Sequence, residues 1–303
     1  AFIAEENAWQ DISGASVLVD LGQQRDVLIT YHIQVESLKS VLNSSPLPTE
    51  SNKDVLQVRA VLDGVPYRAS SSYASTYLVE QRSFNELTSS FVAELNANQV
   101  VASGNTTTGG HLLQLQWKKS GTQVSQWRIS APNLGQGYSI SALADHEKVW
   151  YHHETNDLVL YQKGQWVDAS EKVEFYLRED ANIVIGYAMN VQPQVSQFVK
   201  DRKQEYVTSR IVLDGVAFTE GSETHGTGPW NPSSGCLNGY MSIRLTAGVH
   251  EVQLQWRRMG DIFKSWTSNP TYLDGFASSR NIFVLEEKYE TPSFQDHTRS
   301  ILV

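Results

Sequence analysis

One stretch of the sequence occurs twice. HLLQLQWKKSG begins at His111 and HEVQLQWRRMG begins at His250, with the glutamines, the tryptophan, two basic residues and the glycine in the same places. A second tryptophan follows each copy, Trp127 in the first and Trp266 in the second. Agreement of this kind indicates an internal duplication, so the chain is expected to contain two copies of one structural unit.

Further blocks recur in the same order along the chain. They are VLITYHIQV and IVIGYAMNV, the two VLDGV segments, and the tryptophans Trp9 and Trp166. A length of 303 residues also exceeds the usual size of a single domain. We therefore expect one repeat in residues 1–155 and a second in residues 156–303, with the boundary inside residues 147–165. Matched tryptophans are interpreted as scaffold, because a shared fold needs them twice.

The repeated stretch alternates apolar and polar residues, which is typical of a strand with one buried face. Asp63-Gly64 and Asp214-Gly215 lie between apolar flanks, as in type I′ hairpins. Only residues 83–93 and 195–203 resemble helices, and neither has convincing end signals. Many short strands separated by polar turns predict an all-β chain of two tandem jelly-roll-like β-sandwich domains.

A family resemblance follows from the same blocks. The run from Gly109 through LQWKKSG to Trp127 and GYSIS, echoed by LQWRRMG, Trp266 and GFASS, resembles the last strands of jelly-roll modules in the tumour necrosis factor and complement globular-head families. The resemblance covers about a third of each half. It implies self-association, often as trimers, and extracellular recognition or structural roles. It supplies no catalytic residues.

Charge and composition narrow the partners. The chain has 24 Lys and Arg against 33 Asp and Glu, a net charge of −9, which disfavours nucleic acid and anionic membrane surfaces as partners. No apolar run approaches the roughly 20 residues that span a bilayer, so no membrane insertion is expected. Cys236 is the only cysteine, which excludes an intrachain disulfide. We expect its side chain to be buried, with an interchain bridge or a reactive thiol as the alternatives.

We expect a secreted or cell-surface protein, since the sequence begins at Ala1 rather than methionine. Asn43 and Asn105 each start a glycosylation triplet, although triplets of this kind also arise by chance.

The search for reactive motifs finds no phosphate-binding glycine loop and no Gly-x-Ser-x-Gly, so no cofactor is expected. His152 and His153 are adjacent, and adjacent residues of a strand point to opposite faces, so no metal site is expected there. His111 and His250 share a face with core positions and are interpreted as hydrogen-bonded histidines at the core margin. No carboxylate pair stands out for glycoside cleavage.

The most suggestive stretch without a match in the other half is GSETHGTGPWNPSSGCLNGY, which begins at Gly221. Its composition predicts a loop that carries His225 and Trp230. An exposed tryptophan beside amide side chains suits a sugar ring and its hydroxyls. We therefore expect Trp230, His225 and Trp150 as a sugar-binding set. The alternative is that Trp230 packs over a sandwich end or against the first domain.

The chain ends give a second candidate site. Phe2, Ile3, Ile301, Leu302 and Val303 form short apolar termini that suit strand addition to a neighbouring subunit, which predicts a homo-oligomer or polymer. The alternative is that these residues close the sheet of their own domain.

A duplicated scaffold, the absence of a duplicated polar constellation and apolar termini together favour one function. We expect a non-enzymatic extracellular structural subunit that self-assembles into a filament, appendage or shell. The alternative is a carbohydrate-binding module or adhesin, with glycans as partners. A third interpretation is an enzyme acting on polysaccharide, which requires two carboxylates about 5 to 10 Å apart in a cleft.

Overall fold

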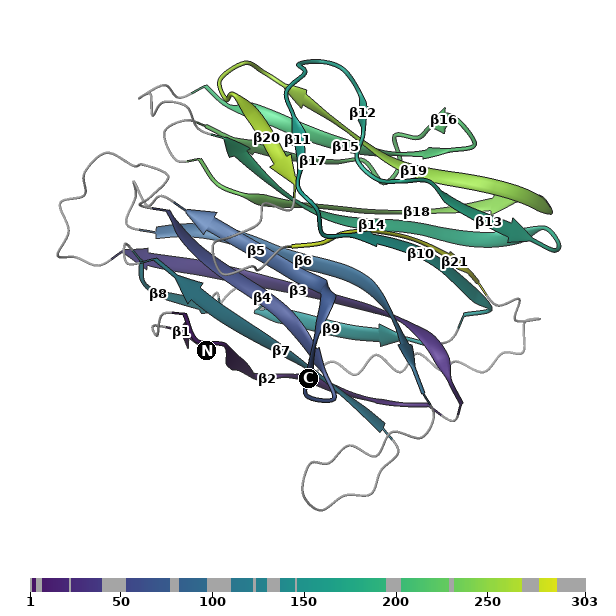
Figure 1. Cartoon of the computed structure of the whole chain (residues 1–303), viewed down its shortest axis with the longest axis horizontal. Helices are drawn as coiled ribbons and strands as arrows, with labels where there is room; N and C mark the ends of the chain where they lie inside the picture. The colour runs from purple at the N-terminus through teal and green to yellow at the C-terminus, as the bar shows by residue number, and fades with distance from the viewer. Residues whose placement is uncertain are drawn as a thin grey trace.

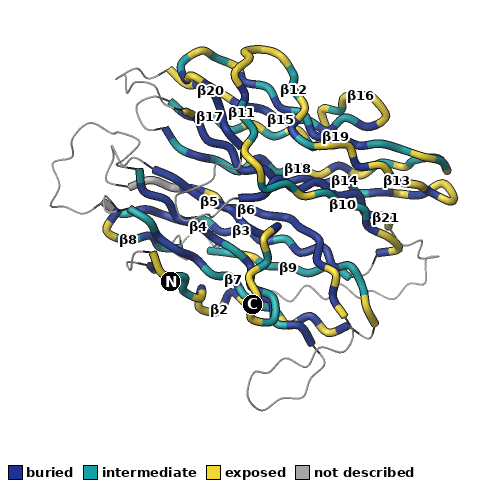
Figure 2. The backbone as a smooth tube through the Cα atoms, viewed as in Figure 1, coloured by how far each residue is buried: buried dark blue, intermediate teal, exposed yellow. Residues whose placement is uncertain are grey.

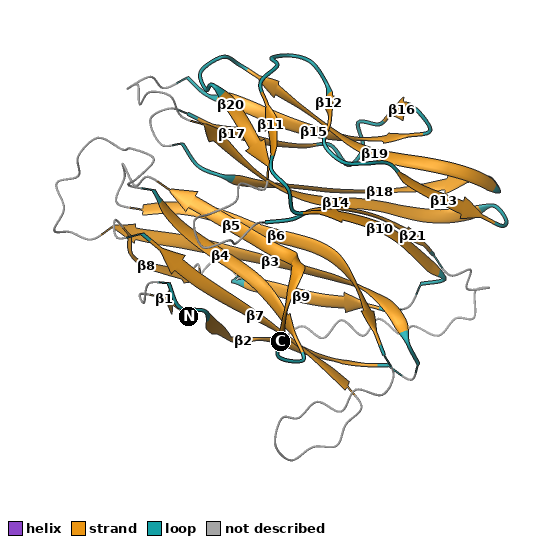
Figure 3. Ribbon diagram, in the orientation of Figure 1, coloured by secondary structure: helices purple, strands orange, loops and turns teal. Residues whose placement is uncertain are grey.

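The computed structural model describes residues 2–3, 7–21, 23–39, 53–76, 82–96, 110–121, 124–129, 137–144, 146–194, 203–228, 232–268 and 278–287. In these residues the chain is all-β, as predicted, and forms two tandem jelly-roll-like β-sandwich domains (Figure 3). No helix in the described part is long and apolar enough to span a membrane.

The first half forms one sandwich (Figure 1). Its strands are β1 (Phe2–Ile3), β2 (Gln10–Asp20), β3 (Arg25–Lys39), β4 (Asp54–Leu62), β5 (Val65–Thr76), β6 (Arg82–Leu95), β7 (Gly110–Ser120), β8 (Val124–Ile129) and β9 (Tyr138–Leu143). One sheet has the order β1-β8-β3-β6, with β9 also paired to β3, and the other has the order β2-β7-β4-β5. A single hydrophobic core fills the space between the two sheets.

The second half forms the other sandwich. Its strands are β10 (Lys148–Glu154), β11 (Leu158–Leu160), β12 (Val167–Asp168), β13 (Val173–Leu177), β14 (Ala181–Gln194), β15 (Glu205–Leu213), β16 (Val216–Ala217), β17 (Glu223–Thr227), β18 (Gly235–Leu245), β19 (Gly248–Met259), β20 (Ser265–Ser268) and β21 (Arg280–Glu286). One sheet has the order β10-β21-β14-β20-β11, with β18 beside β14. The other has the order β12-β19-β15-β16, with β13 beside β19 and β17 beside β15.

The duplicated stretch forms equivalent strands, β7 in the first sandwich and β19 in the second. Buried residues follow both strands (Figure 2). Most apolar residues of the stretch lie in the two cores, and the tryptophans of both copies are among the largest fully buried side chains. These are Trp117, Trp127, Trp256 and Trp266. Burial of an aromatic side chain of this size contributes several kcal/mol to folding, at roughly 25 cal/mol per Å². The most direct reason for the duplicated sequence is therefore that both sandwiches have the same core residues.

Both Asp-Gly pairs form the hairpin turns that the sequence predicts. Asp63 and Asp214 have φ of 52° and 49°, and the glycine that follows each is also positive. Each turn aspartate also holds a histidine of the repeated strand. His111 Nδ1 lies 2.6 Å from Asp63 Oδ2 and its Nε2 lies 2.6 Å from the Asn96 carbonyl oxygen. This interaction is called the histidine clamp below.

The second histidine clamp has the same geometry. His250 Nδ1 lies 2.8 Å from Asp214 Oδ2, and Nε2 lies 2.9 Å from the Thr246 carbonyl oxygen. Each clamp aspartate also accepts the main-chain N–H that follows the histidine, at 2.8 Å in the first half and 2.9 Å in the second. The histidines are thus hydrogen-bonded parts of the scaffold.

A buried acid and base close the far end of the repeated strand in the second half. Glu205 is fully buried, and its Oε1 accepts the Trp266 indole N–H at 2.9 Å and lies 3.0 Å from Arg258 Nε. Its Oε2 accepts the main-chain N–H groups of Ile262 and Phe263. We call these contacts the buried lock. Because Glu205 faces the guanidinium and accepts three N–H groups at the same time, the lock fixes the turn between β19 and β20.

The first half has a corresponding lock with shorter side chains, in which Asp54 and Lys119 stand for Glu205 and Arg258. Asp54 is fully buried and accepts the Val124 main-chain N–H at 3.0 Å. Lys119 donates to the Gly121 carbonyl oxygen at 2.9 Å. Gly121 has a φ of +98°, and a side chain on it would collide with the Asp54 carboxylate. This explains why a glycine stands beside the basic pair in the first copy.

The prediction of a helix in residues 83–93 is wrong. This segment lies in β6, which pairs with β3 along its whole length. Leu87, Phe91 and Ala93 are buried in the first core, and Thr88, Ser90 and Val92 face the other way. Packing on both faces of the sheet decides the conformation here, because tertiary contacts override local propensity. The other helical segment, residues 195–203, lies outside the described residues except for Lys203.

The two sandwiches pack mainly through the sheet with β3 and β6 in the first half and the sheet with β14 and β21 in the second. Strand β5 also contacts the second half, through Ala69 and Ser72. Leu28 and Val92 of the first half contact Val149, Phe283 and Leu285 of the second in a separate apolar cluster. The sheets with β2 and β7 in the first half, and with β12 and β19 in the second, therefore lie on the two outer sides of the molecule (Figure 1). β10 pairs with β21, so the sheet of the second sandwich begins at Lys148. The division of the chain at residue 155 stays a prediction.

Candidate functional site

The outer sheet of the first sandwich carries a row of polar side chains across three strands. Asp11 on β2, Gln116 on β7 and Arg59 on β4 are directly opposite one another in the strand register. Gln116 Nε2 donates to Asp11 Oδ1 at 2.9 Å, and Gln116 Oε1 accepts from Arg59 Nε at 3.1 Å and Nη2 at 2.9 Å. The carboxylate and the guanidinium thus fix the amide from both sides.

An indole ring completes this group. Arg59 Cζ lies 3.9 Å from the ring centroid of Trp9, and Lys118 Nζ lies 5.1 Å from it. Gln116 and Lys118 share a face because side chains alternate along β7, and Trp9 comes just before the residue that pairs with Trp117. The ring is partly exposed and Asp11 is exposed. The first outer site therefore consists of Trp9, Arg59, Lys118, Gln116 and Asp11.

The second sandwich repeats this site strand for strand. Asp168 on β12, Gln255 on β19 and Arg210 on β15 are again opposite one another. Gln255 Nε2 donates to Asp168 Oδ1 at 2.9 Å, and Arg210 donates to Gln255 Oε1 from Nε at 3.1 Å and Nη2 at 2.8 Å. Trp166 supplies the ring, with Arg210 Cζ at 4.1 Å and Arg257 Cζ at 4.5 Å from its centroid. The second outer site therefore consists of Trp166, Arg210, Arg257, Gln255 and Asp168.

The cations of these sites are held against the indole at an electrostatic cost. Desolvation lowers the pKa of Arg59 below its usual value. Desolvation, and then the nearby Arg257 guanidinium, lower the pKa of Arg210. An Arg stacked on Trp contributes about 0.5 to 2 kcal/mol, depending on its exposure. Each site therefore presents a partly exposed ring, a fixed amide, an exposed carboxylate and a partly buried arginine. The second cation is the buried Lys118 in the first site and the partly buried Arg257 in the second.

The sequence interpretation of the paired tryptophans needs correction at Trp9 and Trp166. The other two matched pairs are core residues, as expected, whereas this pair lies on the outer sheets. The statement that no polar constellation is duplicated is also wrong. The signal was present in the alignment, because the outward residues Gln116 and Gln255, like the inward ones, are the same in both copies.

The structure places two of the three expected sugar-binding residues on different sheets of the second sandwich. Trp150 lies on β10 against the second core, with its ring 5.4 Å from that of Phe175 and Lys148 Nζ 4.7 Å from its centroid. His225 lies on β17 of the other sheet, where Nε2 is 3.2 Å from the Ser233 carbonyl oxygen and burial lowers the pKa. Trp230 lies outside the described residues. A sugar-binding role for these three residues stays a prediction.

The expected assembly and glycosylation residues are mostly outside the described part of the chain, where Asn43, Asn105, Ile301, Leu302 and Val303 all lie. Phe2 and Ile3 form β1, which pairs with β8 of the same sandwich. Ile3 is buried in the first core. The Cys236 side chain lies between the sandwiches, with Sγ 3.1 Å from the Thr88 carbonyl oxygen, and burial raises the pKa of its thiol to about 12.

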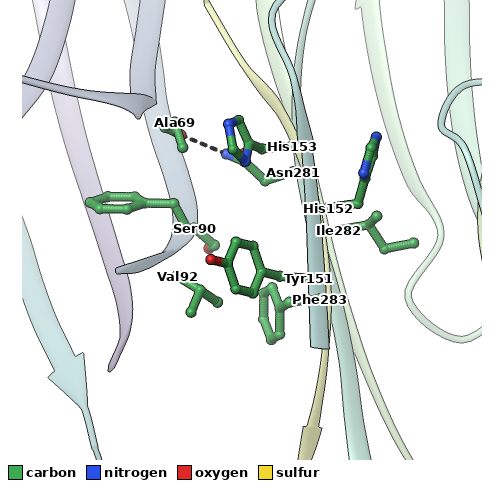
Figure 4. A pocket seen from close by; sticks show the side chains of 10 residues that line it. Ala69, Ser90, Val92, Tyr151, His152, His153, Asn281, Ile282 and Phe283 are labelled. Atoms are coloured by element: carbon green, nitrogen blue, oxygen red, sulfur yellow. Dashed lines mark hydrogen bonds between the residues drawn. The ribbon is translucent and has the colours of Figure 1, made fainter. Parts of the chain in front are cut away.

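A small cavity lies between the sandwiches (Figure 4). Tyr151 and His153 point from β10 toward the first half, and His152 points the other way, as strand geometry predicts. Asn281 Nδ2 donates to the Ala69 carbonyl oxygen across the interface at 2.8 Å. A volume of about 10 Å³ has room for about one water molecule. Within the described residues no group of three or more His, Cys, Asp and Glu side chains converges as a metal site.

Comparison with known proteins gives matches by structure alone. No family model and no curated protein matches the sequence. Among solved structures, PNGF-II is similar at 11% identity and a TM-score of 0.32, over 97% of this chain, which spans 63% of that chain. A peptide-N(4)-(N-acetyl-beta-D-glucosaminyl) asparagine amidase is similar at 8% identity and a TM-score of 0.36, and the match covers 95% of this chain and 96% of that chain. A chain of the T13 IBDV viral particle is similar at 7% identity and a TM-score of 0.27, and the match covers 93% of this chain and 75% of that chain.

These observations overturn two predictions. The expectation of a structural subunit of a filament, appendage or shell rested on the absence of a duplicated polar constellation, and the two outer sites are such a constellation. The expectation of a non-enzymatic protein is also corrected, because the solved structures similar to this chain include an asparagine amidase. The resemblance to tumour necrosis factor and complement globular heads stays a prediction.

Proposed function

We propose that this chain binds carbohydrate through two equivalent outer sites, one centred on Trp9 and one on Trp166. The observation that carries the proposal is the repetition of the same five positions on the solvent side of both sandwiches. A conserved core explains why inward residues match between the copies. It does not require an indole, a guanidinium, an amide and a carboxylate to recur together on the outside.

The chemistry of the sites suits a sugar ring. A pyranose has an apolar C–H face and a rim of hydroxyls, and protein sites meet these with an aromatic ring and a few well-placed polar groups. Here the ring is Trp9 or Trp166. The polar groups are fixed before any ligand arrives, because Gln116 and Gln255 are each held by an acceptor on one side and a donor on the other. Fixed groups lose little entropy on binding.

A purely structural role for the same residues makes a different prediction. Cross-strand pairs contribute about 0.2 to 1 kcal/mol each. If these side chains had only a structural role, substituting them would lower the free energy of unfolding, and the sites would bind no ligand. Binding and stability must therefore be measured on the same variants. A secreted or cell-surface location and self-association through sheet edges stay predictions beside this proposal.

The test is a glycan array followed by titration of the full chain with the best ligand. We expect binding that falls in Trp9→Ala and in Trp166→Ala and disappears in the double variant. Gln114→Ala is the matched control, because Gln114 lies on the same face of β7 two residues before Gln116. N-glycosylated peptides belong in the panel, and mass spectrometry of the recovered ligand separates binding from cleavage.

Two outcomes contradict the proposal. One is an array on which the folded chain binds no glycan. The other is glycan binding that stays unchanged in the double tryptophan variant while circular dichroism and thermal unfolding show it to be folded.

A further inference from the structure

Positive charge gathers at the two outer sites of a chain whose net charge is −9. At the second site two guanidinium groups, of Arg210 and Arg257, lie within 4.1 and 4.5 Å of the same ring centroid. Like charges this close repel each other, and Arg257 accordingly contributes to the lowered pKa of Arg210. A site that holds two cations together gains stability when an anion enters it.

Acidic side chains in the described part of the chain do not neutralise these guanidinium groups. Within the described residues no ion pair joins a carboxylate to Arg59, Arg210 or Arg257. The carboxylate of each site is instead hydrogen-bonded to the glutamine amide, on the far side from the arginine. Other exposed cations do have acids, such as Lys172 with Glu251 at 2.6 Å. The arginines of the two outer sites thus lack an acidic partner among the described residues, although each site contains a carboxylate.

The donors that remain also suit an anion. Arg210 directs Nε and Nη2 to Gln255 Oε1, and no described residue accepts a hydrogen bond from its Nη1. Arg59 has the same arrangement with Gln116 in the first site. Among the described residues, Arg257 donates only to the weak acceptor Met259 Sδ, at 3.7 Å. Guanidinium groups with free donors bind carboxylate and sulfate oxygens more strongly than neutral hydroxyls.

We infer that the ligand of both outer sites is an anionic sugar, one that bears carboxylate or sulfate groups. The inference rests on the proposed function and adds the chemical class of the glycan. The indole contacts the ring, and the arginines bind the anionic substituent. The second site binds the anion more tightly than the first, since Arg257 stands where the first site has Lys118 and a guanidinium can make two parallel hydrogen bonds.

The experiment compares ligands that differ in charge alone. The full chain is titrated with an oligogalacturonate, with the same oligomer after methyl esterification, and with a sulfated oligosaccharide of equal length. We expect the esterified oligomer to bind about tenfold or more weakly, which is the loss of at least one charge-assisted hydrogen bond. The difference between acid and ester should shrink as salt is raised.

Variants of the second site localise the effect. In the Trp9→Ala background only the second site is intact. There Arg257→Gln should reduce the preference for the acid over the ester, and Trp166→Ala should abolish binding of both oligomers. Arg178→Gln is the control, because it removes an equal charge from an exposed loop of the same sandwich.

The outcomes separate the inference from the proposed function. Equal binding of acid and ester that still depends on Trp166 overturns the anionic ligand and leaves carbohydrate binding intact. Absence of binding for every glycan removes both. Equal losses of preference in Arg257→Gln and Arg178→Gln show a diffuse charge effect and overturn the assignment to this site. Tight binding of sulfated oligomer alone supports an anion and identifies sulfate as its source.

Discussion

Both halves have two consecutive basic residues at the same place in the repeated strand, Lys118-Lys119 in the first half and Arg257-Arg258 in the second. In each pair the first residue faces outward to the indole of the outer site, and the second faces inward to the buried lock. One repeated dipeptide therefore serves both the surface and the interior, because neighbouring residues of a strand point to opposite faces.

The two buried locks differ in the hydrogen bonds that their acidic and basic side chains make. In the second half Glu205 accepts the Trp266 indole N–H, and Arg258 donates to four main-chain carbonyl oxygens as well as to Glu205. In the first half the acid is Asp54, one methylene shorter, and the buried indole N–H of Trp127 has no hydrogen-bond partner in the described part of the chain. A duplicated fold thus tolerates a shorter acid only by leaving one donor unsatisfied, which costs about 1 to 3 kcal/mol.

The largest expected effect comes from breaking the lock of the second half. Arg258→Met leaves the Glu205 carboxylate buried without its cation, so we expect the free energy of unfolding to fall by about 3 to 5 kcal/mol. Lys119→Met is the matched change in the first half. We expect it to cost less, since the ammonium has fewer donors to lose than the guanidinium. Urea denaturation of the full chain measures both, and equal losses would remove the difference between the halves.

A smaller effect is expected when the second lock is made to resemble the first. Glu205→Asp shortens the acid, so the carboxylate no longer reaches the Trp266 indole, and we expect a loss of about 1 to 3 kcal/mol. Trp266 fluorescence should shift as its N–H loses the carboxylate. Unchanged stability and unchanged fluorescence would show that the extra methylene has no role.

The histidine clamp of the second half predicts a pH dependence. Both ring nitrogens of His250 face acceptors, which only the protonated ring satisfies with two donors. Burial opposes the charge, but hydrogen bonds to the Asp214 carboxylate and the Thr246 carbonyl outweigh it and raise the pKa of His250. Since the folded pKa lies above the unfolded value of about 6.5, this stability is present below about pH 6.5 and is lost as pH rises through the folded pKa.

The measurement is unfolding free energy from pH 5 to 9 in the parent chain and in His250→Gln. We expect the variant to lose about 1 kcal/mol or less at low pH and to have a flatter profile in the neutral range, since the pair is close to the surface. Parallel profiles for the two chains would contradict a protonated clamp.

The smallest expected effect concerns the outer sites. Lys118→Arg gives the first site the residue that the second site has, so we expect a gain of a few-fold in affinity for an anionic sugar. Titration in the Trp166→Ala background isolates the first site. An unchanged or lower affinity would show that the two sites differ for another reason.

Much of the fold was predictable from the repeat. The alternation in the stretches that begin at His111 and His250, and the Asp-Gly pairs, predicted two strands and two hairpins that the structure confirms. The segment in β6 was mistaken for a helix because Leu, Glu and Ala favour helices locally, whereas pairing with β3 is a contact distant in sequence.

The outer sites were less predictable for the same reason. Arg59, Gln116 and Asp11 lie on three strands, and their meeting depends on a register that only the folded sheet specifies. Their recurrence in the second half was visible as matched outward residues. What misled the interpretation was the assumption that every matched tryptophan belongs to the core, which Trp9 and Trp166 contradict.

The central claim is that the chain has two equivalent carbohydrate sites, and stoichiometry tests it most directly. Native mass spectrometry of the full chain with one defined oligosaccharide should show two ligands per chain, one after Trp9→Ala or Trp166→Ala, and none after both substitutions. Two ligands bound to the folded double variant, or one ligand that neither single substitution affects, would contradict the account.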